Sequence, residues 1–347
     1  MKRIATLTAM LAVFALRLAA CGGGVVDDGP LADDTATEPA TEAPEEPSDT
    51  DEVTDETDTT EPATTEPADD ATEAEPTEAP SEGPAADPDD TEGEPADEVA
   101  TTEVTLYYLA PGGEESHRPG PFLIAVHREI PSTPRIALAT LRELFAGPSA
   151  ADEALVDGIA TAVPDNALVL DVAITDGLAT VDLSREFESG GGSLSMFARL
   201  AQVVYTVSQW PTVDEVAFEL DGEPVTVFSN EGIMIDGPAD RSDFLDLLPR
   251  VFVDAPAAGS ELRSGDRITG VAAVFEATFE YRLANAVGEV LARGFESTDN
   301  GTGWGAFEWA LTFDVDQQQP GVLTVWEESA RDGSDQAVRH TPVVLVP

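Results

Sequence analysis

Cysteine and histidine are scarce in this sequence of 347 residues, which holds one cysteine and three histidines. A single cysteine excludes a disulfide within the chain and a metal site built from several thiolates. His117, His127 and His340 are scattered, without the short His and carboxylate spacings that zinc sites use. The sequence therefore predicts no metal and no cofactor.

Basic residues are also few, because 17 lysines and arginines stand against 68 acidic residues, for a net charge of -51. Residues 22–100 contain 29 acidic residues and no basic one, and residues 101–347 contain 39 acidic residues against 14 arginines. Both parts of the chain therefore repel the phosphate backbone of nucleic acids. We expect no nucleic-acid partner.

Long apolar runs are missing except at the N-terminus, where Ile4 to Leu16 follow Lys2 and Arg3. This run is shorter than the about 20 apolar residues of a membrane-spanning helix, and it is typical of a signal peptide. The next residues, Leu18-Ala19-Ala20-Cys21, resemble the lipobox of bacterial lipoproteins, in which the cysteine accepts a diacylglyceryl group.

Residues 1–20 are therefore interpreted as a lipoprotein signal peptide, and Cys21 as the lipid attachment site. The alternative is an ordinary cleavage site with an incidental cysteine. Arg17 departs from the usual pattern of such signals, since it places a charge directly before the lipobox. The expected location is the outer face of the cytoplasmic membrane, with the lipid as anchor and the rest of the chain reaching into the cell wall.

Residues 21–100 consist almost entirely of Asp, Glu, Thr, Pro and Ala, and they lack aromatic residues. Such a composition cannot bury enough apolar surface to offset the entropy of folding. Repeated prolines and like charges favour extended geometry. We expect a long disordered tether, with weak calcium binding or glycosylated threonines as open alternatives.

Residues 101–236 combine alternating β-rich runs with helical stripes, which predicts an α+β domain of two helices on a mixed sheet. The expected strands are Thr102–Leu109, Phe122–Val126, Leu168–Ile174, Leu178–Leu183, Val213–Leu220 and Pro224–Phe228. The first helix begins at Thr133-Pro134 and the second is capped by Ser193. Their expected buried stripes are Ala137, Leu138, Leu141, Leu144 and Phe145, and then Leu194, Phe197, Ala198, Ala201, Val204 and Tyr205.

This region resembles the GerMN domain, the module named for sporulation and germination proteins. The matching pieces are Val104–Leu109, Arg128, Leu144–Pro148, Ala162–Pro164, Leu178–Ser184, Phe187, Ala201–Thr206 and Val216–Gly222. Each piece has a structural cause, such as the helix end at Gly147-Pro148 or the hairpin turn at Asp221-Gly222. The resemblance implies an envelope role based on contacts with other proteins.

Residues 237–249 are interpreted as a linker, and residues 250–347 as an all-β immunoglobulin-like sandwich without a disulfide. The expected strands are Val251–Val253, Ile268–Phe275, Thr278–Leu283, Val290–Glu296, Gly305–Phe313, Gly321–Glu328 and Ala337–Val346. This stretch resembles the immunoglobulin-like Gmad domain of spore germination. The resemblance rests on Val253–Pro256, Gly259, Ile268–Gly270, Phe275–Ala277, Ala286–Gly288, Gly303–Phe307 and Ser329–Ser334.

No motif in the sequence predicts catalysis. Gly190-Gly191-Gly192-Ser193 lacks the G-x-S-x-G pattern of a nucleophile elbow, so Ser193 is interpreted as a helix cap. Glu276 and Glu280 would need a cleft to act as a hydrolytic pair. The aromatic residues Trp304, Phe307, Trp309 and Trp326 could stack on sugar rings if exposed, although such residues more often pack a core.

The sequence thus favours a non-enzymatic envelope lipoprotein whose domains bind other envelope proteins, in a sporulation-type or wall-associated complex. Its binding surfaces are expected at an open edge of the GerMN sheet or at the sandwich loops. The alternative is a wall-glycan-binding protein or hydrolase. Exposed coplanar tryptophans or a carboxylate-lined cleft would favour that alternative.

Overall fold

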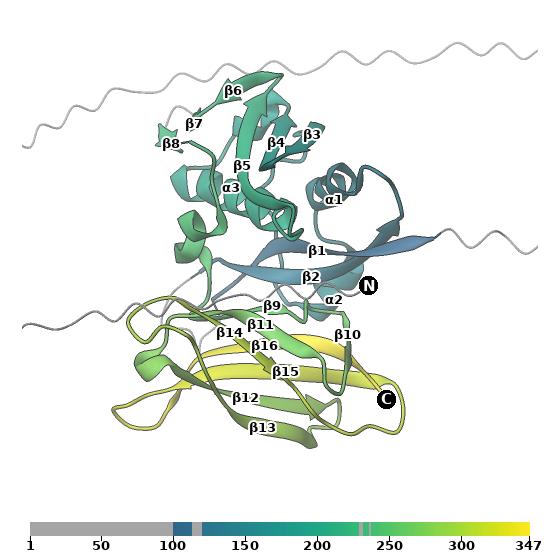
Figure 1. Ribbon diagram of the computed structural model, residues 1–347, viewed down its shortest axis with the longest axis vertical. Helices are drawn as coiled ribbons and strands as arrows, with labels where there is room; N and C mark the ends of the chain where they lie inside the picture. Colours follow the sequence, from purple (N-terminus) through teal and green to yellow (C-terminus); the bar gives the residue numbers. More distant parts are fainter. Residues whose placement is uncertain (1–99, 113–119, 229–231, 236) are drawn as a thin grey trace, which may run out of the picture. The chain divides into compact units, whose positions relative to one another are not determined.

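The computed structural model describes residues 100–112, 120–228, 232–235 and 237–347. The predicted signal peptide, Cys21, His117 and all of the predicted tether but residue 100 lie outside these residues. Within them an α+β domain precedes an all-β domain, which confirms the predicted fold class (Figure 1). None of the helices in this part of the chain is long and apolar enough to cross a membrane.

The α+β domain opens with a long antiparallel ribbon of two strands, β1 (Thr101–Ala110) and β2 (Phe122–Pro131). Thr101 pairs with Pro131 at one end and Ala110 with Phe122 at the other. The ribbon is a sheet of its own, so the expectation of one sheet for the whole domain is wrong. Strand β1 contacts helix α3 and strand β2 contacts β9 of the second domain, which buries most of the ribbon's aliphatic and aromatic side chains.

Three α-helices occur in this domain rather than the two expected: α1 (Ile136–Phe145), α2 (Ala150–Leu155) and α3 (Ser193–Val207). Helix α1 buries Ala137, Leu138, Leu141 and Leu144, as the sequence pattern predicts. The missed helix α2 has a capping box in which Ser149 and Asp152 each accept from the other's backbone N–H. The Ser-x-x-Asp spacing indicates a helix N-terminus, but a helix of six residues is too short to show a periodic apolar stripe.

Helix α3 differs in two ways from the prediction. Its N-cap is Gly192, so Ser193 is the first helical residue and not the cap. Leu194, expected in the buried stripe, is 56% exposed, whereas the polar Arg199 and Gln202 are buried. Gln202 donates to the carbonyl of Tyr107 at 3.0 Å and accepts from the amide of Ala162 at 2.8 Å. The helix is therefore buried nearly all round, and its polar residues satisfy backbone groups of neighbouring segments.

The second sheet of the domain has four strands in the order β3-β4-β5-β6. They are β3 (Val169–Thr175), β4 (Gly177–Leu183), β5 (Val213–Leu220) and β6 (Glu223–Val225). Strands β4 and β5 are parallel, with α3 in the connection between them, and the other pairs are antiparallel. The predicted mixed sheet is therefore confirmed, and a short pair of β7 (Val227–Phe228) and β8 (Ile233–Met234) follows it.

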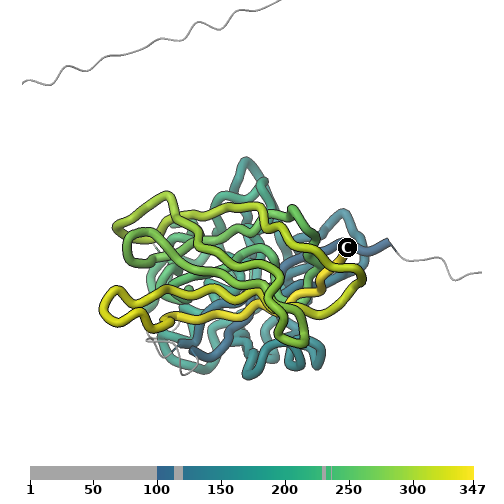
Figure 2. Tube along the Cα trace, turned by 90° about the horizontal axis from the view of Figure 1, so that it is seen from below, coloured from purple at the N-terminus to yellow at the C-terminus, as the bar shows by residue number. Residues whose placement is uncertain are grey.

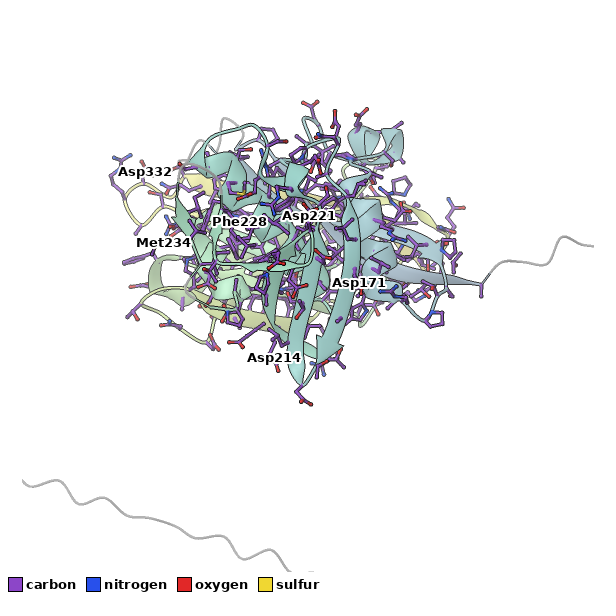
Figure 3. All side chains as sticks on the ribbon, turned by 90° about the horizontal axis from the view of Figure 1, so that it is seen from above. Asp171, Asp214, Asp221, Phe228, Met234 and Asp332 are labelled. Carbon is purple, nitrogen blue, oxygen red and sulfur yellow. The ribbon has the colours of Figure 1, made fainter. Side chains whose placement is uncertain are left out.

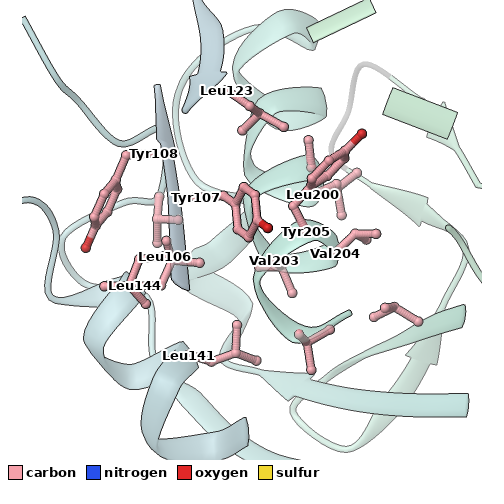
Figure 4. Packing of buried hydrophobic residues seen from close by; sticks show 14 of the residues in the cluster. Leu106, Tyr107, Tyr108, Leu123, Leu141, Leu144, Leu200, Val203, Val204 and Tyr205 are labelled. Carbon is pink, nitrogen blue, oxygen red and sulfur yellow. The ribbon is translucent and has the colours of Figure 1, made fainter. Parts of the chain in front are cut away.

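The core of this domain lies between the β1–β2 ribbon and the helices. Figure 4 shows Leu106 and Tyr107 of β1 among Leu141 and Leu144 of α1 and Val203, Val204 and Tyr205 of α3. Tyr107 and Tyr205 pack edge to face, with ring centroids 5.4 Å apart. A single apolar core therefore fixes how the ribbon and the helices pack together.

The all-β domain is a sandwich of a three-stranded and a five-stranded sheet, with orders β14-β11-β9 and β10-β16-β15-β12-β13 (Figure 2). Its strands are β9 (Val251–Ala255), β10 (Glu261–Arg263), β11 (Arg267–Ala272), β12 (Thr278–Asn285), β13 (Val290–Ser297), β14 (Gly305–Ala310), β15 (Gln319–Glu328) and β16 (Asp335–Val346). All the predicted strands are present, while the three-residue β10 was missed. Strand β11 ends earlier than expected, because a 3-10 turn over Phe275–Ala277 leads into β12.

The predicted linker, residues 237–249, joins the two domains but is not an exposed connection, so this interpretation is wrong for its second half. The 3-10 segment Arg241–Leu247 buries Phe244 and Leu247, and Leu248 is buried beside it. These side chains belong to the same apolar cluster as Phe252, Ala257 and Ala258 of the second domain. The two domains therefore share a core at Leu245, Leu247 and Leu248.

Candidate binding surfaces

A polar network links three distant segments where the domains meet. Arg241 donates from Nη1 to Asp254 at 2.9 Å, from Nη2 to the hydroxyl of Tyr107 at 3.1 Å, and from Nε to Ser208 Oγ at 2.8 Å. The hydroxyl of Tyr107 donates to the other oxygen of Asp254. Arg241 Nη2 also reaches the carbonyl of Tyr205 at 3.0 Å. These four hydrogen bonds tie the guanidinium to structural partners in the fold.

This network lines a hollow of about 630 Å³, so its chemistry must be weighed as a possible active site. Burial raises the pKa of Tyr107 well above its usual range, and burial does the same for Tyr205. Burial would lower the pKa of Arg241, but the charges and hydrogen bonds of Tyr107 and Asp254 raise it. The phenols thus stay protonated and the guanidinium charged at neutral pH, which is the opposite of what a general base requires.

A second feature is the open edge of the four-stranded sheet. Among the described strands, β3 pairs with β4 alone. Its residues Leu170 and Ile174 are each 40% exposed, and the preceding Leu168 is 59% exposed. A register shift between Val169 and Asp171 disturbs one end of the edge, which leaves the stretch from Val172 to Thr175 regular. An edge of this kind can accept an added strand from another chain.

Acidic side chains cover the outer face of this sheet. Strand pairing places Asp171 of β3 opposite Asp182 of β4, and Asp182 beside Glu219 of β5. In Figure 3, Asp171, Asp214 and Asp221 lie spread along the sheet, away from Asp332 on its loop. Arg135 forms an ion pair with Asp171, and Arg185 pairs with Asp221 at 3.3 Å. The negative surface lies next to the β3 edge, so the edge is apolar within an acidic border.

Most of the residues that the sequence analysis considered as catalytic, metal-binding or sugar-stacking candidates do not come together in the structure. His127 lies on β2 and His340 on β16, and Ser193 opens helix α3. Trp309 and Trp326 are buried, with Trp326 under the guanidinium of Arg293 at 5.7 Å from the ring centre. Trp304 is half-buried and packs against the first core. The tryptophans therefore form no exposed pair for sugar stacking.

The two glutamates considered as a hydrolytic pair do come together. Glu276 and Glu280 line one hollow of about 490 Å³ on the sandwich, together with Glu328. Two aromatic side chains that the sequence reading did not single out, Phe275 and Phe295, line it as well and are 58% and 71% exposed. No periodicity signal could have found this grouping, because its members come from three separate segments.

The sequence analysis also did not predict a small cluster of possible metal-ligating side chains on the β1–β2 ribbon. Ligand atoms of Glu103, His127 and Glu129 lie within 4.8 Å of one another. Strand register explains the group, since Glu103 pairs with Glu129 and His127 stands two residues away on the same face. The carboxylates are exposed, and exposed acidic groups gather in this way without a metal.

Comparison with known families agrees with this architecture. Residues 105–226 match the Germane family, described as sporulation and spore germination, and residues 250–334 match Gmad2, an immunoglobulin-like domain of bacterial spore germination. The chain therefore contains a Germane domain followed by a Gmad2 domain. The predicted GerMN and Gmad resemblances are therefore confirmed, with both modules in the predicted order.

Solved structures with similar parts include two from Bacillus subtilis. The first GerMN domain of its sporulation protein GerM is 21% identical, with 41% of this chain and 99% of that chain covered and a TM-score of 0.34. The tandem GerMN domains of GerM are 16% identical, with 61% and 62% covered and a TM-score of 0.37. A putative lipoprotein from Clostridium perfringens is 19% identical, with 45% and 98% covered and a TM-score of 0.28. No curated protein matches the chain.

The first prediction concerns the network around Arg241. Replacing Arg241 with Ala leaves Asp254 and the Tyr107 hydroxyl without their cation, so we expect the free energy of unfolding to fall by about 2 to 3 kcal/mol. Urea denaturation of the full chain measures this change. The matched control is Arg263→Ala, which removes an exposed pair with Glu261 at 2.6 Å and should cost less than about 1 kcal/mol. Equal losses in the two variants would contradict the assigned role.

The second prediction concerns alkaline pH. All four tyrosines have a raised pKa in the folded chain, chiefly because burial disfavours the phenolate. The unfolded chain releases these protons near pH 10, so stability present below about pH 10 should be lost as the pH rises above it. Urea denaturation at several alkaline pH values measures the slope, and Tyr107→Phe should reduce it. Tyrosinate absorbance that appears well before unfolding would refute the prediction.

Proposed function

We propose that this protein is a non-enzymatic scaffold of the cell envelope. In this proposal Cys21 carries the lipid anchor on the outer face of the cytoplasmic membrane, and the Germane domain holds another envelope protein at the edge of β3. Both domains are of sporulation and germination type, which supports a role in a complex of that kind. The observation that carries the proposal is the open edge of β3.

The edge of β3 has the chemistry of a strand-addition site. Main-chain N–H and C=O groups along an edge strand supply affinity, and alternate side chains supply specificity. Leu170 and Ile174 are partly exposed aliphatic residues of β3, and they offer apolar contacts to an added strand. The irregular register at Leu170 and the exposed Arg135–Asp171 pair interrupt regular pairing at the N-terminal end of β3, which limits indiscriminate strand addition. This combination favours a selective partner over aggregation.

A non-enzymatic role is supported by where the perturbed groups lie. The strongly shifted pKa values belong to Tyr107, Tyr108, Tyr205, Arg241 and Asp332, and the shifts hold these groups in their neutral-pH forms. Catalytic sites usually move a pKa toward neutrality instead. The wall-glycan alternative loses its stacking argument because Trp309 and Trp326 are buried. Turnover of purified peptidoglycan by the full chain would contradict the scaffold proposal.

The third prediction tests the β3 edge. A photocrosslinking amino acid that replaces Ile174 should form one covalent adduct of defined mass with the partner protein in intact cells. Adding Leu170→Lys should abolish that adduct, because a buried ammonium in the interface is costly. The matched control places the crosslinker at Leu194, an exposed leucine of α3 outside the sheet. The same adduct from both positions, or one insensitive to Leu170→Lys, would count against the edge.

The fourth prediction tests the anchor. If Cys21 is lipidated, the mature chain should begin at this residue and carry added lipid mass. Cys21→Ser removes the thiol that accepts the lipid, so the variant should leave the membrane fraction or stay unprocessed. Fractionation of cells and intact-mass analysis measure both effects. A mature chain that begins elsewhere and carries no lipid would rule out the anchor.

A further inference from the structure

One hollow of the Gmad2 domain combines exposed aromatic and acidic side chains. Its volume is about 490 Å³, and it lies between the Phe275–Ala277 turn, strand β13 and the loop after β15. Phe275 and Phe295 are 58% and 71% exposed on its walls. Phenyl rings this exposed are unusual in an isolated sandwich, since nothing described in the chain covers them.

The turn that presents Phe275 is strained and firmly held. Glu276 and Ala277 have φ values of 53° and 56°, a left-handed region that is unfavourable for residues other than glycine. The nearly buried Glu327 accepts from the amide of Phe275 at 2.8 Å and pairs with Arg250 at 2.9 Å. A buried carboxylate, itself paired with the partly exposed Arg250, therefore holds the backbone at Phe275, whose ring is exposed. Strain maintained in this way is typical of binding sites.

The charge around the hollow is negative. Glu276, Glu280, Glu328 and Asp332 line it, and Arg331 is the basic residue among the lining groups. Arg331 pairs with Asp332 at 3.0 Å and the nearby Arg293 pairs with Glu280 at 3.1 Å, so the acidic groups still outnumber the basic ones. Hydrogen bonds from Ser334, Arg331 and Ser329 lower the pKa of Asp332 to about 2, so its charge persists. A hydrogen bond and the charge of Glu280 raise the pKa of Glu328, with Asp335 adding to the effect and Arg293 opposing it. Two carboxyl groups thus crowd each other beside the exposed rings.

We propose that this hollow binds a basic, partly apolar segment of a partner protein, in which a lysine or arginine lies over Phe275 and Phe295. A cation above a phenyl ring is attracted by the ring's negative face, and the apolar neighbours of the cation bury the ring edges. The same cation relieves the repulsion between Glu280 and Glu328. The hollow thus matches the partner in both charge and apolar character.

Other occupants match the hollow less well. Nucleic acids and anionic lipid headgroups are repelled by the acidic rim. A neutral glycan could stack on the rings but would leave the net negative charge of the hollow unbalanced. The hollow is also separate in sequence from the β3 edge, so this proposal does not depend on the function proposed for the Germane domain.

The fifth prediction uses the peptide KLKWK as a probe and its uncharged analogue QLQWQ as the reference. The full chain, purified in mild detergent, should bind KLKWK more tightly than QLQWQ by calorimetry. Combining Phe275→Ser with Phe295→Ser should weaken KLKWK binding by about tenfold, as expected for losing desolvated cation–π contacts. Glu328→Gln, which keeps the shape of the side chain, should weaken it by about two- to fivefold.

The acidic residues 22–100 also attract cationic peptides, so the informative readout is the loss caused by the pocket substitutions. The matched control combines Val287→Ser and Val290→Ser, which replace side chains that are 87% and 51% exposed outside the hollow, and it should leave affinity unchanged. Unchanged thermal unfolding verifies that each variant is folded. If the phenylalanine pair has no effect, or if QLQWQ binds as tightly as KLKWK, the proposal is wrong. The β3 crosslink should persist in all these variants.

Discussion

The arrangement of both domains depends on one guanidinium group, that of Arg241, and on the apolar side chains beside it. Arg241 comes from the segment between the domains, Tyr107 from the ribbon of the first and Asp254 from the first strand of the second. The ribbon residue Tyr107 is thereby tied to two residues that lie more than a hundred positions later in the chain. Because Phe244, Leu248 and Phe252 share a core next to this point, the two domains do not behave as beads on a flexible linker.

A shared core has consequences for binding. The β3 edge and the Phe275–Phe295 hollow stand on domains held in a fixed relation, so a partner that contacts both meets a preorganised pair of surfaces. Preorganisation lowers the conformational entropy lost on association. Two weak contacts can then give a strong one, provided that the partner's own geometry reaches both sites.

Acidic charge is common to both surfaces. Carboxylates border the β3 edge and the hollow, while the chain has almost no lysine to offset them. Negative charge of this kind repels anionic polymers. Apolar residues nevertheless remain accessible at the β3 edge and in the hollow. In the binding that we propose, selectivity for a basic, partly apolar partner follows from the contrast between the acidic surroundings and the exposed Phe and Ile side chains.

The sequence alone determined the two-domain order, the fold class, most strands and the helices with an apolar stripe, because hydrophobic periodicity and turn residues are local signals. Short elements such as α2 and β10 were missed since they span too few residues to show a period. Burial of Arg199 and Gln202 was also invisible, because a polar side chain enters a core only when distant backbone groups accept or donate hydrogen bonds to it.

What tertiary structure alone decided is which side chains meet. The linker prediction for residues 237–249 is wrong for the second half of the segment, because its leucines pack in the apolar cluster that the two domains share. Two groupings are formed by residues from separate segments of the chain. One is the network of Tyr107, Arg241 and Asp254. The other is the hollow lined by Phe275, Glu280, Phe295 and Glu328. Strand register and sandwich packing bring them together, and neither can be read from local spacing.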